Sequence, residues 1–408
     1  MLGLDRTIRR NTLVLAAVTA VNSVVLQLVS AVSSITFVLV TGEKGLLGLG
    51  PAVFLTSSGL TAGVAGRTMD RVGRRPVLAA GFLAAAAGCC LTALATRTSS
   101  VLTLLAGFVL IGAGMATSLL IRAAAGDMYV AARRARGISY VLSGAVVGAV
   151  LGPLVFTPMF AHRKLDGHAL TVPWLAAAGI ALIALVMVML VRPDTRAIGQ
   201  LLSDRDGHAP AAPAAPLAEI IRRPGVIPAM TASLASFAVM VSVMNLAGYV
   251  VVEENHHSQD SVFPIIGAHV LGMYALVLVV GALIDRVGRT PALAGGLVVM
   301  GASTLGLQWF GSVPMTALLL FGLGIGWNIS FVAATAQMVD HTSPVERGKL
   351  LGFNDLIAAL LGASLALIGG YGLESAGVGA LAIGATAIVI SPVAWLMWRV
   401  PAPDAAGA

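Results

Sequence analysis

Four side chains in the second half of the 408-residue sequence could together bind a soft metal ion. His269 lies in the apolar stretch "GAHVLGMYA" with Met273 four residues later, and Met240 and Met244 have the same spacing in the preceding apolar run. Residues four apart share one face of a helix. Imidazole and thioether ligands favour Cu(I) over hard cations. The sequence therefore predicts a candidate metal site at these four residues.

Two other interpretations of these residues stay open. Methionine fills irregular gaps between apolar helices, and a histidine within a membrane can bond a hydroxyl or a backbone carbonyl of the next helix. His269 could instead contact a substrate other than a metal, or carry a proton, because imidazole titrates near physiological pH.

Membrane-spanning helices are the elements that must position these side chains. Hydrophobic residues make up 58% of the chain and charged residues 11%, which is typical of an integral membrane protein in contact with lipid. A spanning helix needs about 20 mostly apolar residues, and the sequence predicts twelve of them. Their approximate ranges are 13–40, 46–66, 77–96, 101–123, 137–161, 172–191, 226–252, 263–284, 292–310, 313–338, 348–370 and 376–398.

Basic residues predict how the chain crosses the membrane, since Lys and Arg near helix ends stay on the cytoplasmic side. With the N-terminus inside, the outer side receives 4 of the 25 Lys and Arg residues: Lys44, Arg97, Arg163 and Lys164. We expect a multi-pass protein of the cytoplasmic (inner) cell membrane with both termini cytoplasmic. The net charge of +7 then reflects orientation, and no nucleic-acid surface is expected.

An internal repeat divides the chain. The segments "GRTMDRVGRRP" and "GALIDRVGRTP" each follow the second span of a half, and Asp70 and Asp285 occupy the same position in them, 215 residues apart. We expect two homologous six-helix halves at residues 1–191 and 225–408. Residues 192–224, which contain "GHAPAAPAAP", are expected to form a flexible or partly extended cytoplasmic linker.

The first repeated segment resembles the loop signature of the major facilitator superfamily, Gly-x-x-x-Asp-Arg-x-Gly-Arg-Arg, at every fixed position. The resemblance covers the full chain. It implies an all-α secondary transporter of twelve transmembrane helices, with its site between two rocking halves, and a loop that acts as a gate. The gate candidates, from the signature and from its echoes in both halves, are Asp70, Arg71, Arg74, Asp285, Arg286, Asp127, Arg136, Asp340 and Arg347.

Two other motifs bear on the direction of transport. The stretch "GAVVGAVLGP" has glycines at i, i+4 and i+8, a stripe on which another helix can pack closely. It is similar to the core of the antiporter signature of the superfamily, although Phe156 and Thr157 replace the trailing glycines. Phe108 and Ile111 stand where proton-coupled drug exporters carry arginine and glutamine, which weakens an inference of export.

Polar side chains inside the spans are candidates for function because they are costly in lipid. We expect Asn245 and Asn328 to contact substrate, and Trp327 either to do so or simply to pack. Asp355 is a coupling candidate that could carry a proton or pair with Arg347, roughly 12 Å away along the same helix.

Within the superfamily, the Met-x-x-x-Met and His-x-x-x-Met pairs resemble those of the bacterial copper importers that supply cytochrome oxidase assembly, a group with relatives that carry riboflavin. This resemblance implies copper uptake as the favoured function. Proton-coupled export of small organic compounds and uptake of an organic cargo such as riboflavin are the alternatives. We expect no enzymatic activity, no P-loop and no cofactor. Protons are the candidate coupling ion, and a monomer is expected.

Overall fold

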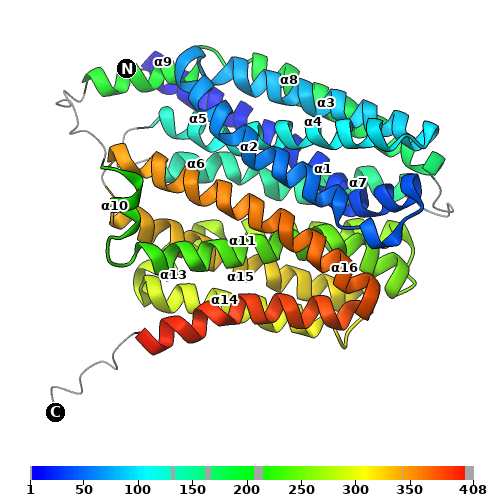
Figure 1. The fold of residues 1–408 in the computed structure, drawn as a ribbon. Coiled ribbons are helices and arrows are strands. Elements are labelled where there is room, and N and C mark those ends of the chain that lie inside the picture. The colour runs from blue at the N-terminus through cyan, green and yellow to red at the C-terminus, as the bar shows by residue number, and fades with distance from the viewer. Residues whose placement is uncertain (1, 130–133, 161–166, 206–214, 343, 400–408) are drawn as a thin grey trace.

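The structure, a computed structural model, describes residues 2–129, 134–160, 167–205, 215–342 and 344–399 (Figure 1). Regular structure in these ranges is helical throughout, so the prediction of an all-α fold is confirmed. The first part of the chain forms α1 (Leu2–Thr41), η1 (Lys44–Leu46), α2 (Leu49–Val72), α3 (Arg74–Thr98), α4 (Val101–Leu119), α5 (Ile121–Asp127), α6 (Arg134–Leu142), α7 (Gly144–Phe160) and α8 (Gly167–Met189).

Two short helices, α9 (Thr195–Arg205) and α10 (Leu217–Ile221), follow. The remaining elements are α11 (Val226–Tyr249), η3 (Val250–Glu254), η4 (Gln259–Ser261), α12 (Val262–Tyr274), α13 (Val277–Val287), α14 (Arg289–Gly306), α15 (Val313–Asp340) and α16 (Pro344–Arg399). α16 combines the last two predicted spans, which part at Gly377, where the backbone is not helical (φ +69°).

Within the described residues each predicted span falls largely on helix, and three are interrupted: 101–123 at Leu120, 137–161 at Ser143, and 263–284 at Ala275 and Leu276. Nine helical stretches of the described chain are long and apolar enough to cross a membrane. The predicted spans outside these nine are 263–284 and 292–310. The first is divided into α12 and α13, of 13 and 11 residues, so neither part reaches the roughly 20 residues that a straight crossing requires. Non-helical backbone at membrane depth is tolerated where protein surrounds it.

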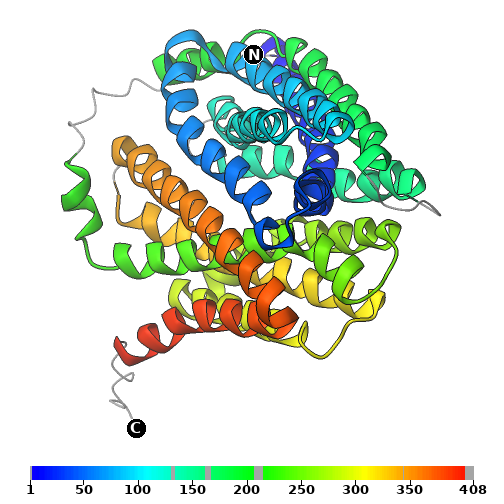
Figure 2. The same cartoon turned by 45° about the vertical axis from the view of Figure 1, so that its right-hand side comes forward.

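The helices form two bundles that lie side by side, α1–α8 in one and α11–α16 in the other (Figures 1 and 2). The start of α1, the end of α16, α9 and α10 lie at the same end of the molecule, which we call the terminal end (Figure 1). The opposite end, which holds η1 and η4, is the distal end.

A glycine stripe on α7 lets this helix pack closely on α1. A Cβ atom at Gly144 would overlap the carbonyl of Ala16, and one at Gly148 would lie 2.5 Å from Cβ of Ser23. The amide of Gln27 donates to the Gly148 carbonyl at 2.7 Å. Close approach of small residues is what drives helix association in lipid, so the stripe serves the packing that its spacing predicts.

The segment predicted as a flexible or partly extended linker is helical in part. α9 buries Ile198 completely and packs on α3 and α5, and α10 buries Ile220 completely. Each short helix therefore has an apolar face that a bundle covers, and burial of this face stabilises it. Residues 206–214 of the linker lie outside the described residues.

The two halves meet along the distal end. Ser34 of α1 donates its hydroxyl to the carbonyl of Asn245 on α11 at 2.9 Å, and a Cβ atom at Gly248 would overlap the carbonyl of Ala31. α7 and α12 meet there through stacked phenylalanine rings whose centroids are 5.6 Å apart. Because Ser34 and Asn245 are buried, this seam shuts the distal side of the interface.

Replacing Gly148 by Val tests the α1–α7 contact. The added side chain must displace Ser23 or α1 itself, and overpacking costs about 1–3 kcal/mol. We expect a lower melting temperature of the detergent-purified protein. Val147→Leu, on an exposed position of the same helix, is the control and should melt like the wild type. Equal melting of Gly148→Val and wild type would contradict the packing described.

Candidate functional site

His269 is completely buried on α12 and has one ring nitrogen without a partner. Its Nδ1 lies 2.7 Å from the carbonyl oxygen of Leu320 on α15. A carbonyl only accepts, so Nδ1 carries the hydrogen and Nε2 of the neutral ring carries a lone pair. Nε2 has no hydrogen-bond partner among the described residues. An unpaired buried nitrogen is costly, which makes it a candidate ligand or proton acceptor.

The three methionines predicted beside His269 are also buried, with exposed fractions of at most 8%. Met273 shares α12 with His269, and the backbone of this helix meets α15 at Gly324, where a Cβ would lie 2.9 Å from the Met273 nitrogen. Met240 and Met244 lie on α11, which packs on α1, α15 and α16. Convergence of all four side chains on one ion therefore stays a prediction.

Aromatic rings from α11, α12 and α15 form a continuous array near these residues. Trp327 stacks on Phe331 with 4.9 Å between ring centroids and a 16° angle between planes. Tyr274 meets Trp327 edge-on at 6.4 Å, and Phe237 meets Phe331 at 6.2 Å. The indole N–H of Trp327 has no partner among the described residues. The array offers aromatic faces and one free donor.

Trp327 was predicted from the sequence, whereas Tyr274, Phe331 and Phe237 were not. The four-residue spacing of Trp327 and Phe331 was the available signal, since it sets both rings on one helical face. Contacts of these rings with α11 and α12 depend on tertiary packing and leave no sequence pattern.

Two buried asparagines carry acceptor oxygens, one beside the array on α15 and one at the distal seam on α11. Asn328 donates its amide to the carbonyl of Met273, and Asn245 donates to the carbonyl of Val241 at 2.7 Å. In both, the side-chain oxygen has no partner among the described residues. The Asn328 oxygen, next to the Trp327 donor on α15, could help to orient a polar organic molecule by hydrogen bonds.

Arg122 and Asp355 form an ion pair between the halves on the terminal side of the distal seam. Nη2 of Arg122 on α5 lies 3.5 Å from Oδ2 of Asp355 on α16, with side chains 37% and 39% exposed. Asp355 was predicted to carry a proton or pair with Arg347; the contact found is with Arg122. Arg122 was missed, although it is the one basic residue within the predicted span 101–123.

The gate candidates pair in the same way in both halves. Nε of Arg74 lies 2.7 Å from Oδ2 of Asp127, and Nε of Arg289 lies 3.2 Å from Oδ2 of Asp340. Arg289 was missed although it stands 215 residues after Arg74, the offset of the repeat. The repeated sequence thus builds one ion pair twice.

A carboxylate from the linker holds the first gate loop. Gly73 ends α2 and begins α3 with a φ of +102°, and Gly288 does the same before α14 with a φ of +90°; glycine adopts such angles without strain. Asp194 accepts the backbone N–H groups of Arg74 and Arg75 at 3.1 and 2.8 Å. Asp194 therefore caps α3. Gly73, the residue at the N-cap position, has no side chain that could accept these hydrogen bonds.

Among the remaining gate candidates, only Arg71 and Arg286 have side chains within the described part of the structure. Arg71 and Arg286 are exposed; the carbonyl of Arg71 accepts a hydrogen bond from Arg196 at 2.7 Å. Side chains of four further candidates lie outside the described part of the structure: Asp70, Arg136, Asp285 and Arg347.

Comparison with known proteins decides the family, because the family model for the Major Facilitator Superfamily matches residues 13–268 and 232–408. The chain belongs to this superfamily. A facilitator of this kind is a multi-pass membrane transporter of small molecules and not an enzyme. Two transporters of known structure share its fold with a TM-score of 0.73. The xylose transporter XylE from E. coli is 14% identical (97% of this chain, 100% of that one), and a POT family transporter is 13% identical (95% and 96%).

Two relatives are closer in sequence. An uncharacterized MFS-type transporter, YdeG of Bacillus subtilis, is 31% identical over 335 residues, which cover 79% of this chain and 76% of the relative. The riboflavin transporter RfnT of Brucella anthropi is 30% identical over 371 residues, 90% of each chain.

Replacing Asp194 by Ala tests the cap of the first gate loop. Loss of a cap typically costs about 1 kcal/mol, so the melting temperature should fall. Asp194→Asn keeps one acceptor oxygen, so its melting temperature should fall less. Gln200→Ala, an exposed position on α9, serves as control. If Asp194→Ala melts like the wild type, the carboxylate does not stabilise α3.

Proposed function

We propose that this transporter takes up a small organic solute with a planar aromatic ring system. The observation that carries the proposal is the array of Tyr274, Trp327 and Phe331, with an unpaired indole N–H beside it. Aromatic side chains bind flat rings by stacking, and a few unpaired polar atoms set their orientation. Riboflavin has such a ring system, and a riboflavin transporter is among the relatives.

The proposed mechanism is alternating access by residues 1–191 and 225–408, with 192–224 as the linker. Both termini are cytoplasmic in this proposal, as the basic residues indicate, and the protein acts as a monomer in the cytoplasmic membrane. The distal seam then faces outward and is closed, and cargo leaves the aromatic array toward the cytoplasm when the halves separate at the terminal end. Release of cargo inward followed by opening of the seam completes a cycle.

Protons are the proposed coupling ion, and Asp355 is the proposed carrier. Its carboxylate pairs with Arg122 across the halves and is 39% exposed, so water can deliver a proton to it. Protonation removes the negative charge and with it the attraction to Arg122. The two halves are then free to separate at the terminal end, which links proton movement to the conformational change.

Uptake of riboflavin into proteoliposomes tests the proposed cargo. Trp327→Ala removes a stacking partner worth about 0.5–1.5 kcal/mol, so we expect KM to rise by up to about tenfold. Trp309→Ala, at a position 64% exposed, is the matched control and should leave KM unchanged. Absence of riboflavin-dependent uptake, or of thermal stabilisation by riboflavin, would reject this cargo.

Replacing Asp355 by Asn tests the proton link. In this variant, an inward proton gradient should no longer increase riboflavin uptake, because the Asn amide cannot bind and release a proton as a carboxylate does. Riboflavin exchange without a gradient should persist. Glu374→Gln, at an exposed position, should keep the response. If a proton gradient still increases riboflavin uptake by Asp355→Asn, Asp355 is not the proton carrier.

Copper uptake is a second candidate, favoured by the lone pair on Nε2 of buried His269. Neutral imidazole and thioethers are ligands that Cu(I) prefers. If copper is the cargo, copper uptake by cells should fall in His269→Ala and in Met273→Leu, which conserves volume. Met189→Leu, 41% exposed, is the control. Equal uptake by His269→Ala and wild type would rule copper out.

A further inference from the structure

The second part of the linker is docked on the second half of the molecule. Ile220 of α10 is completely buried there. It belongs to a small apolar cluster separate from the main core, whose buried members are Ile220, Val226, Ala229, Met230, Met338 and Leu350. These residues come from the linker, the start of α11, the end of α15 and the start of α16. The linker therefore shares a core with the turn that joins α15 and α16.

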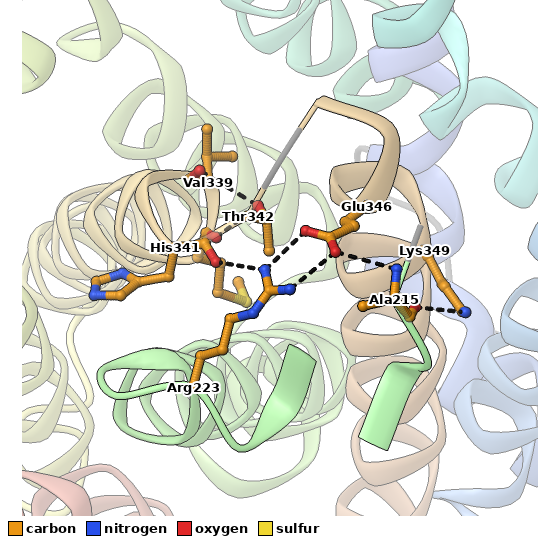
Figure 3. Close-up of polar contacts among 8 residues, drawn as sticks. Ala215, Arg223, Val339, His341, Thr342, Glu346 and Lys349 are labelled. Carbon is orange, nitrogen blue, oxygen red and sulfur yellow. Dashed lines mark hydrogen bonds and ion pairs between the residues drawn. The ribbon is translucent and has the colours of Figure 1, made fainter. Parts of the chain in front are cut away.

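A buried carboxylate in this turn is bound by the linker (Figure 3). Glu346, in the first turn of α16, is 4% exposed. Its Oε2 accepts from Nη1 of Arg223 at 2.7 Å and its Oε1 from Nη2 at 2.9 Å. The backbone N–H of Ala215 also donates to Oε1, at 3.2 Å. A bidentate arginine fixes both the distance and the orientation of a carboxylate.

The same arginine reaches the other side of the turn. Nη1 of Arg223 donates to the carbonyl of His341, just beyond the end of α15, at 3.0 Å (Figure 3). The hydrogen bonds to Glu346 raise the pKa of Arg223 above its ordinary value. Lys349 donates to the carbonyl of Ala215 at 3.1 Å, so both polar atoms of the Ala215 backbone bond to α16.

Both helices at this turn carry charges that act elsewhere. α15 ends at Asp340, next to His341, and Asp340 pairs with Arg289 of the gate loop. α16 begins before Glu346 and carries Asp355, which pairs with Arg122 of the first half. The angle between α15 and α16 therefore determines the positions of Asp340 and Asp355 relative to each other.

We propose that linker residues 215–225 are a strap that fixes the α15–α16 turn, and that Arg223 and Glu346 are positioning residues for the Arg289–Asp340 gate. The strap makes the turn move as one rigid body with α11 when the halves rock. Without it, α15 and α16 gain freedom at the terminal end, and the gate pair forms in several geometries. This role concerns the transport movement and does not depend on the identity of the cargo.

The test measures the movement directly by spin-label distances in the full-length protein. Labels at Val72 and Val287, the exposed last residues of α2 and α13, report the separation of the halves at the terminal end. Exposed Cys90 is first replaced by Ala. Arg223→Met alone leaves a buried charge unpaired and could unfold the turn. The informative variant is therefore Arg223→Met with Glu346→Leu, which replaces the ion pair by apolar groups.

We expect this double variant to melt like the wild type, because apolar replacement of an ion pair with a buried member, here Glu346, is often neutral for stability. Its distance distribution should be about twofold broader, since the released turn samples more states. Arg223→Lys, which keeps the charge but loses the bidentate geometry, should be intermediate. Arg222→Ala, an exposed neighbour, should match the wild type. A wild-type distribution in both the double variant and Arg223→Lys would overturn the proposal.

Discussion

The rest of the structure depends on the close backbone contact between α1 and α11 at the distal end. Gly248 has no side chain, so α11 approaches the carbonyl of Ala31, and the hydroxyl of Ser34 reaches the carbonyl of Asn245. The Arg122–Asp355 ion pair lies on the terminal side of this contact, and both of its side chains are partly exposed there. A typical hydrogen bond contributes only about 1 kcal/mol net. The Ser34–Asn245 bond therefore adds little to the seam, which depends mainly on packing such as that of Gly248 on Ala31 and of Phe156 on Phe263.

The ion pairs near the terminal end differ in burial, and this difference separates moving contacts from fixed ones. Asp340 and Asp355 have side chains 50% and 39% exposed, and exposed pairs contribute about 0–1 kcal/mol. They can therefore break in every transport cycle at little cost. Glu346 has a side chain only 6% exposed, and separating it from Arg223 would leave a buried charge without a partner. The first two pairs suit a gate, whereas the third suits a permanent joint.

Much of the fold could be predicted from the sequence because the relevant signals are local. Runs of apolar residues give the helices, and the repeated loop containing Asp70 and Asp285 identified the superfamily. The ion pairs were harder, since Asp127 and Arg74 are 53 residues apart and meet only through packing. Arg289 could have been found by applying the repeat to Arg74. Arg122 is marked out as the one basic residue within the predicted span 101–123, but its pairing with Asp355 was not predictable, and Asp194 and Glu346 could not be found because no periodicity relates them to their partners.

Two stretches of the linker are more ordered than its composition indicates. A flexible or partly extended segment was predicted for residues 192–224, yet α9 and α10 form because Ile198 and Ile220 each find an apolar surface on a bundle; most of the Pro/Ala repeat lies outside the described residues. Propensity is a weak guide for such short helices, since tertiary burial supplies most of their stability.

A single helix, α15, joins the two candidate cargo sites. The Leu320 carbonyl holds Nδ1–H of His269, and Trp327 stands two turns further along, about 10 Å away along the axis. A carbonyl that fixes the tautomer is how proteins prepare histidine to bind a metal. The same bond also orients a neutral ring as a hydrogen-bond acceptor for an organic ligand. The geometry at Nδ1 is therefore compatible with both a copper ion and an organic ligand, whereas the stacked rings favour only an organic ligand with a planar ring system. This asymmetry is why the aromatic array carries more weight than the histidine in assigning the cargo.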